Sequence, residues 1–166
     1  MPTRHEHELE TAVGSLALSG RPVDDVIARI PASDWVKRPA PHLNHVLWIL
    51  GHLTVTRGFL VRTFGSRDGV VALDPLFNGG TPVREGDVYP SPSIVISAWR
   101  DMAVRLDRAV KTVVPGDLQR PSPEGAPTFN GRVGGALAAS VFHEAYHVGQ
   151  LGYLTRWLGY RPLLGG

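Results

Sequence analysis

The apolar residues of this chain recur every three or four positions in four long segments, which is the spacing of an α-helix. The pattern predicts helices over about residues 6–18, 45–64, 92–113 and 133–158, with a shorter helical piece at residues 22–30. The sequence contains neither an alternating strand pattern nor an internal repeat. It therefore predicts an all-α protein built as a helix bundle.

Residues with strong positional preferences divide these helices from one another. Pro22 separates the first helix from the short piece, because proline fits the first turn of a helix and interrupts its interior. Asn44 is a candidate N-cap for the second helix, and Ser91 is one for the third. Segments 66–90 and 115–132, rich in Gly and Pro, are predicted loops. The first loop is long enough to return along a whole helix, so the relative direction of its flanking helices stays open.

Composition and charge are those of an ordinary globular protein. Hydrophobic residues make up 43% of the chain, and the net charge of +2 comes without a basic cluster, so neither nucleic acid nor a membrane surface is an expected partner. There is no run of about 18 apolar residues, and the first residues lack the apolar core of a signal peptide. We therefore expect one cytoplasmic domain spanning residues 1–166.

The lack of cysteine narrows the available chemistry. With no cysteine in the sequence, the chain forms no disulfide, thiolate nucleophile or Cys-based zinc site. Any metal ion must therefore be held by histidine and carboxylate side chains.

Two histidines four residues apart lie in the apolar, Ala-rich part of the last predicted helix. His143 and His147 fall on one helical face, at a spacing that lets two imidazoles bind one metal ion. Their row is predicted to point inward, where burying two unliganded imidazoles costs free energy. His52 lies on the inward face of the second helix. Together the three histidines predict an open metal site in which water completes the coordination.

A fourth histidine, His45, lies two helical turns before His52 on the same face. That separation is about 10 Å, too far for both to bind one ion. We expect His45 to form part of the wall of the pocket above the site.

Residues 143–147 also match H-E-x-x-H, the zinc-protease motif in which the glutamate activates a bound water. The protease interpretation fails, because the residues three and six positions after His147 are not the required glycine and histidine, and no acid follows Glu144. Two hypotheses for Glu144 remain. It acts as a catalytic base or as a partner of a metal ligand, or it pairs with an arginine such as Arg132 or Arg62.

Two segments of the chain, 44–53 and 142–151, resemble the DinB-like superfamily, the damage-inducible helical metalloproteins related to bacterial thiol-dependent transferases. The specific features are Gly51-His52-Leu53 in the first segment, and His143-x-x-x-His147 followed by Gly149-Gln150 in the second. The helix order and the long middle loop also fit, so the resemblance covers nearly the whole chain.

This resemblance implies a four-helix bundle of up-down-down-up topology, with a long crossover between helices 2 and 3, often assembled as a homodimer. It implies a divalent zinc or nickel ion bound by His52, His143 and His147. For some members it also implies transfer chemistry, in which the metal activates a low-molecular-weight thiol, such as mycothiol or bacillithiol, toward a small-molecule substrate. An ion held by three neutral imidazoles keeps its charge and lowers the pKa of a bound water or thiol.

Three interpretations follow from these observations. The first is a metal-dependent enzyme, a thiol transferase or a hydrolase, with loops 66–90 and 115–132 shaping its pocket. The second is a bundle that binds a metal or small molecule without turnover, as in sequestration or a stress response. The third, a bundle without metal, holds if His52 faces away from His143 and His147.

Overall fold

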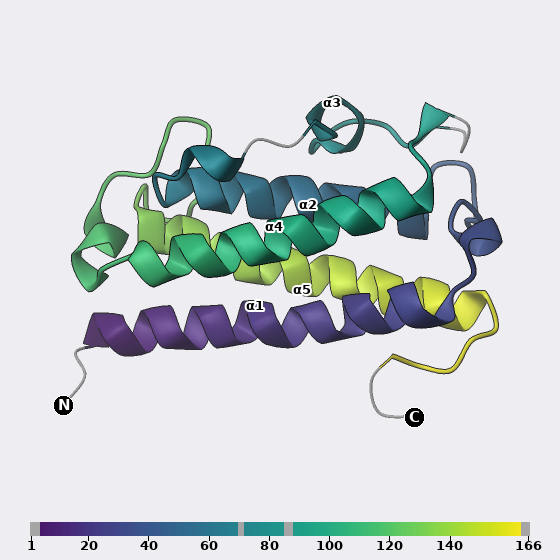
Figure 1. The fold of residues 1–166 in the computed structure, drawn as a ribbon, viewed down its shortest axis with the longest axis horizontal. Coiled ribbons are helices and arrows are strands. Elements are labelled where there is room, and N and C mark those ends of the chain that lie inside the picture. The colour runs from purple at the N-terminus through teal and green to yellow at the C-terminus, as the bar shows by residue number, and fades with distance from the viewer. Residues whose placement is uncertain (1–3, 70–71, 85–87, 164–166) are drawn as a thin grey trace.

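The structure, a computed structural model, describes residues 4–69, 72–84 and 88–163, and these residues form an all-helical protein. Four long helices lie side by side (Figure 1): α1 (Arg4–Arg29), α2 (Val46–Thr63), α4 (Pro92–Thr112) and α5 (Val133–Trp157). Short helices lie in the connections: η1 (Ala32–Asp34), η2 (Arg67–Gly69), α3 (Asp74–Phe77) and η4 (Pro115–Gln119). The all-α prediction is confirmed.

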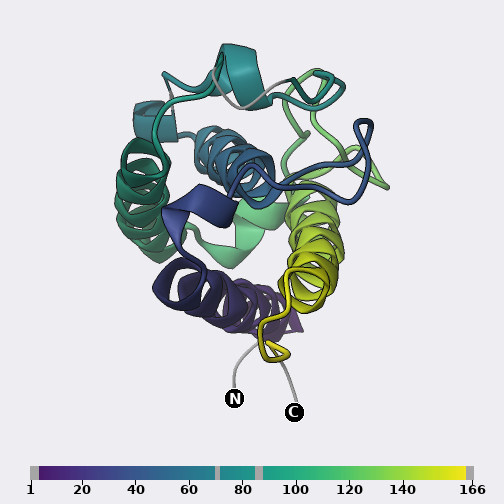
Figure 2. The same ribbon diagram turned by 90° about the vertical axis from the view of Figure 1, so that its right-hand side faces the viewer.

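The long helices surround a common core. Figure 2 shows α1 opposite α2, and α4 opposite α5. α2 packs against both α4 and α5, while α1 packs against α5. In Figure 1, α1 and α5 run toward the end where the C-terminus lies, and α2 and α4 run the other way. The connection from α2 to α4 contains η2 and α3, which lie beside α2.

This connection covers the outer side of α2. Both η2 and α3 contact α2, and Phe77 of α3 is fully buried against Gly51. A Cβ atom at Gly51 would overlap the Phe77 ring, so only glycine fits this close approach. α2 is buried on nearly every side, which explains why it is apolar all round and not only along one stripe.

The two helical pieces predicted at the N-terminus form one continuous helix. α1 passes through Pro22 without ending. A proline inside a helix removes one hydrogen bond and costs about 3 kcal/mol. The turns after Pro22 bury Val23, Val26 and Ile30 in the core. This burial outweighs the local cost, so the predicted helix end near Leu18 is wrong.

The boundaries of the other long helices lie within one or two residues of those predicted. Ser91 precedes the first residue of α4, and α5 ends before Gly159, whose φ of 87° is in the left-handed region. The N-cap of α2 is His45 rather than Asn44. His45 Nδ1 accepts a hydrogen bond from the backbone N–H of Trp48 at 3.1 Å.

The largest fully buried side chains mark the centre of the core: Trp35, Trp99, Phe77, Leu47, Ile49, Leu50, Leu53, Leu60 and Leu151. The Trp35 indole N–H donates to the carbonyl oxygen of Ile30 at 2.8 Å, which satisfies its buried polar atom. None of the helices in the described part of the chain combines the length and the apolar character needed to cross a bilayer.

Candidate metal centre

Three histidines from two helices meet inside the bundle. His52 comes from α2, and His143 and His147 come from α5. Nε2 of His143 lies 3.0 Å from Nε2 of His52 and 3.1 Å from Nε2 of His147. The structure thus brings together the three histidines that the sequence analysis selected, and His52 does not face away from the other two.

The second ring nitrogen is fixed in two of these histidines. His52 Nδ1 lies 2.7 Å from the carbonyl oxygen of Phe77, and His147 Nδ1 lies 2.8 Å from Oε1 of Gln150. A carbonyl oxygen only accepts, so both Nδ1 atoms carry the hydrogen in these contacts and both Nε2 atoms present a lone pair. Proteins orient metal-binding imidazoles with this type of hydrogen bond.

Hydrogen bonds among the three converging nitrogens cannot pair all of them at once. A single hydrogen on His143 Nε2 serves either His52 or His147, but not both. Burial is the main cause that lowers the pKa of each ring, to about 4 for His147, and repulsion between the rings lowers the pKa of His143 and His147 further. Neutral imidazoles with converging lone pairs are the donors that zinc and nickel bind, so these residues fit a divalent ion.

Aromatic rings and one loop surround the three histidines. Trp48 stacks on His52, with ring centroids 4.7 Å apart and planes at 19°. Tyr146 meets the ring of His147 edge to face at 5.1 Å. A Cβ atom at Gly79 would lie 3.9 Å from Cε1 of His52, so the loop after α3 passes close to the site. His143 is half-buried whereas His52 and His147 are buried, which indicates that the site opens beside His143.

Glu144 forms a buried ion pair with an arginine of α2. Arg57 Nε donates to Oε2 of Glu144 at 2.8 Å, and Arg57 Nη2 donates to Oε1 at 2.6 Å. The Ser19 hydroxyl of α1 also donates to Oε1. The geometry therefore agrees with the second hypothesis for Glu144, pairing with an arginine. The partner is Arg57, and neither Arg132 nor Arg62 as the sequence analysis suggested.

His45 does not join the group of three histidines. It caps α2, and its ring meets the ring of Tyr89 edge to face at 5.1 Å. Burial, together with the positive charge of Arg38, lowers the pKa of His45 to about 4. A role in a pocket wall stays a prediction.

Three contributors to this region were missed from the sequence: Arg57, the Gln150 amide and the Phe77 carbonyl. Arg57 had a detectable signal, because Arg57 and Arg62 are the only charged residues in the sequence of α2, and Glu144 is the only acidic residue in that of α5. Opposite charges in two apolar helices indicate a buried pair. The Phe77 carbonyl had no such signal in the sequence, because every residue carries a backbone carbonyl group.

The fold and the site define a class: helical proteins in which histidines from two helices form a site suited to a metal ion. A family model of the DinB superfamily matches residues 16–151, a range that contains all three histidines. The match covers most of the 166 residues, and the chain belongs to the DinB superfamily. A search of curated proteins found no significant match.

Proposed function

We propose that the protein binds one divalent metal ion, zinc or nickel, through His52, His143 and His147. The observation that carries this proposal is the convergence of three Nε2 atoms, two of them on rings held through Nδ1. Three imidazole ligands leave a position for water or substrate, as in catalytic zinc sites.

The activity we propose is that of a metal-dependent transferase, which uses a low-molecular-weight thiol and a small-molecule electrophile. A divalent ion in such a site acts as a Lewis acid and lowers the pKa of a water or thiol bound to it. The Phe77 carbonyl and the Gln150 amide hold His52 and His147 in fixed tautomers, and Trp48 and Tyr146 line the histidines with aromatic surface. The chain has no cysteine, so the thiol would arrive as a co-substrate. Membership of the DinB superfamily supports this activity by analogy.

For Glu144 we propose a structural role in place of the catalytic role considered from the sequence. A general base needs a lone pair within reach of the proton that it removes. Glu144 is 3% exposed, and its two oxygens already accept hydrogen bonds from Arg57 and Ser19.

The exposed face of α5 supports a homodimer. Its aromatic side chains have high exposed fractions: Phe142 75%, Tyr146 57%, Tyr153 60% and Trp157 44%. Phe142 and Trp157 lie equally far on either side of the Gly149–Gln150 peptide bond, and so do Tyr146 and Tyr153. We call this set the aromatic face of α5. An antiparallel pair of α5 helices, with a two-fold axis at that bond, would bring aromatic residues opposite aromatic residues, with Gly149 and Gln150 at the crossing.

We further propose one domain over residues 1–166, with up-down-down-up topology and a crossover between α2 and α4. The opposite run of the helix pairs in Figure 1 and a core that all the long helices share support this assignment.

The test of the metal centre is elemental analysis of untagged protein beside the His52→Ala and His42→Ala variants. His42 is exposed and outside the group of three, so it serves as the matched control. We expect about one equivalent of zinc or nickel in wild type and control, and a loss in His52→Ala. Wild-type protein without metal, even after incubation with zinc and nickel, would overturn the proposal. Assays with mycothiol and bacillithiol then test turnover, and bound metal without turnover would favour the binding interpretation.

A further inference from the structure

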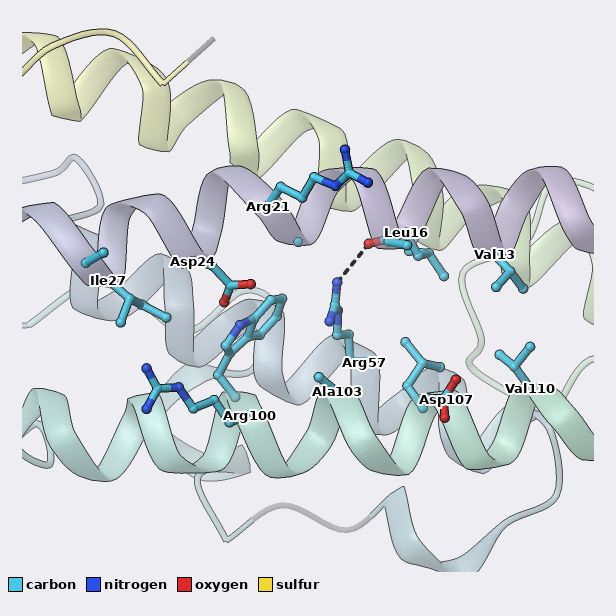
Figure 3. A pocket seen from close by; sticks show the side chains of 15 residues that line it. Val13, Leu16, Arg21, Asp24, Ile27, Arg57, Arg100, Ala103, Asp107 and Val110 are labelled. Atoms are coloured by element: carbon cyan, nitrogen blue, oxygen red, sulfur yellow. Dashed lines mark hydrogen bonds between the residues drawn. The ribbon is translucent and has the colours of Figure 1, made fainter.

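A groove runs along the seam between α1 and α4, away from the three histidines. It encloses about 690 Å³, within the usual size range of small-molecule sites, and none of the three histidines lines it (Figure 3). Leu16 and Ile27 of α1 contribute apolar surface to it, and Trp99 and Leu106 of α4 contribute from the other side. The groove is therefore a second candidate site, separate from the proposed metal centre.

Arg57 reaches this groove from α2, where Figure 3 shows its side chain between the two helices. Its Nε and Nη2 atoms bond Glu144 and the carbonyl oxygen of Leu16. No atom of the described residues accepts a hydrogen bond from its Nη1, which carries two hydrogens. Arg57 is only 6% exposed, and its guanidinium lies 3.9 Å from the centre of the Trp99 ring. The groove thus contains a donor that the other bonds of Arg57 hold in place, that is not sealed from solvent, and that has no acceptor among the described residues.

The charges around the groove favour an anion. Arg21 of α1 and Arg100 of α4 line it from opposite sides, and Asp24 is the acid that lies near them (Figure 3). Glu144 neutralises the charge of Arg57, and Lys111 pairs with Asp107, the other acid of the lining. Two arginines beside one aspartate leave one excess positive charge.

Apolar side chains line the groove on both sides of Arg57. In Figure 3, Val13 and Val110 lie on one side of Arg57 together with Asp107, and Ile27 lies on the other side with Asp24 and Arg100. Gly20 and Val13 of the lining are two helical turns apart on α1, so this stretch of the groove is about 10 Å long. That length suits a medium-length alkyl chain or a small aromatic group.

We propose that the α1–α4 groove binds a small amphiphilic monoanion, a carboxylate carried on an alkyl or aryl body. The carboxylate accepts hydrogen bonds from Arg57 Nη1, and Arg21 and Arg100 add electrostatic attraction. The apolar body packs against apolar side chains of the lining, such as Val13, Leu16 and Leu106, and is removed from water there. This binding is independent of the proposed metal centre.

The test is isothermal titration calorimetry of the full chain with octanoate, beside octan-1-ol, which has the same tail without the charge. We expect saturable binding of octanoate, at least about tenfold tighter than that of octanol. The His52→Ala variant should bind octanoate as wild type does, since the groove does not use that histidine. Binding lost in His52→Ala would place the carboxylate at the metal centre and overturn the proposal, as would the lack of saturable octanoate binding.

Two further variants locate the site. Ala103→Trp fills the groove from α4, whereas Ser97→Trp places the same side chain at an exposed position of α4 outside it. We expect Ala103→Trp to weaken octanoate binding by at least about tenfold and the control to leave it unchanged. Should Ala103→Trp not fold, the double variant Arg21→Gln/Arg100→Gln supplies the test. This double variant should weaken the binding of octanoate but not the binding of octanol. Octanoate binding that survives in the folded variant tested would overturn the proposal.

Discussion

Arg57 and Glu144 form a two-point ion pair across the interior of the bundle, with N···O distances of 2.8 and 2.6 Å. Glu144 directly follows one of the candidate metal ligands, and Arg57 lies on the helix that carries His52. The ion pair and the histidines therefore join α2 to α5 at two places. Through the Trp99 ring and the Leu16 carbonyl, the same guanidinium also contacts α4 and α1.

Replacing Glu144 by Gln leaves the charge of Arg57 buried without its counter-ion. We expect the free energy of unfolding to fall by about 3–5 kcal/mol, the usual cost of breaking a buried ion pair from one side. Denaturant unfolding followed by circular dichroism measures it. The control is Asp107→Asn, which removes an exposed pair with Lys111 and should change stability little. A Glu144→Gln loss no larger than that of the control would contradict the structural role.

A double variant separates the contribution of the ion pair to stability from the contribution of side-chain packing. Arg57→Met with Glu144→Leu removes both charges, so neither is left buried alone. We expect it to recover much of the stability lost in Glu144→Gln, because apolar replacement of a whole buried pair is often neutral. A double variant that is less stable than Glu144→Gln would show that hydrogen bonds to the surrounding helices dominate.

Gly51 determines how closely Phe77 approaches α2, and hence where the Phe77 carbonyl meets His52 Nδ1. A methyl group at Gly51 would overlap the Phe77 ring, so α3 must move and the hydrogen bond to His52 must lengthen. We expect Gly51→Ala to lower metal affinity by about 10- to 100-fold, typical for losing the group that orients a metal-binding histidine. Competition with a chromogenic chelator measures this affinity.

The matched control for Gly51→Ala is Gly14→Ala in α1. A Cβ atom at Gly14 meets nothing within 4 Å, so metal affinity should be unchanged. Helix stability should rise slightly, because alanine is a better helix former than glycine. Equal metal affinity in both alanine variants would argue against the role of the Phe77 contact.

Helix positions and the three histidines could be predicted because both depend on periodicity. His143 and His147 share a face by their spacing alone, and His52 was assigned inward because its row also carries large apolar residues, Ile49 and Phe59. The predicted break near Pro22 was wrong for a physical reason. The effect of proline on a helix is local, whereas the burial of Val23 and Val26 that opposes it arises from tertiary packing.

The contacts that orient the site could not be predicted from the sequence. Pairing of Glu144 with Arg57 depends on how α2 and α5 are rotated about their axes, and residue spacing within one helix does not determine that rotation. The acceptor for His52 Nδ1 is the backbone carbonyl of a residue in a connecting segment. The type of that residue does not indicate that its carbonyl meets a histidine. The groove at Arg57 likewise depends on the packing of α1 beside α4.

His45 makes the stability of the protein depend on pH. Burial and Arg38 lower its pKa from 6.5 to about 4 in the folded protein. Below pH 6.5 the unfolded chain binds a proton that the folded protein does not, so the stability contributed by neutral His45 is present above that pH and is lost as the pH falls toward 4. We expect the denaturation midpoint of metal-free protein to fall across this window.

The variant that isolates this effect is His45→Asn. Asparagine keeps an acceptor at the N-cap of α2 but does not titrate. We expect a shallower loss of stability with falling pH than in wild type, at similar stability above neutral pH. An identical pH profile would assign the whole effect to the other histidines.

The aromatic face of α5 makes a directional prediction that a chain without cysteine allows to be tested cleanly. In the proposed antiparallel pair, Tyr146 of one copy lies opposite Tyr153 of the other. Tyr146→Cys chains mixed in equal amounts with Tyr153→Cys chains of different mass should therefore form the mixed disulfide well beyond the roughly twofold excess over either like pair that random pairing gives, since a disulfide requires close Cβ atoms. Non-reducing mass spectrometry measures the three products.

Pairing in any other orientation gives a different set of products. A parallel pair brings each residue beside its own copy, so like pairs would exceed the mixed product and refute the antiparallel arrangement. The control Ser97→Cys, at an exposed position of α4, should stay unlinked. Sedimentation equilibrium should find wild type as a dimer and Gly149→Arg as a monomer, because a long charged side chain at the crossing separates the helices. A monomeric wild type at the same concentrations would refute the homodimer altogether.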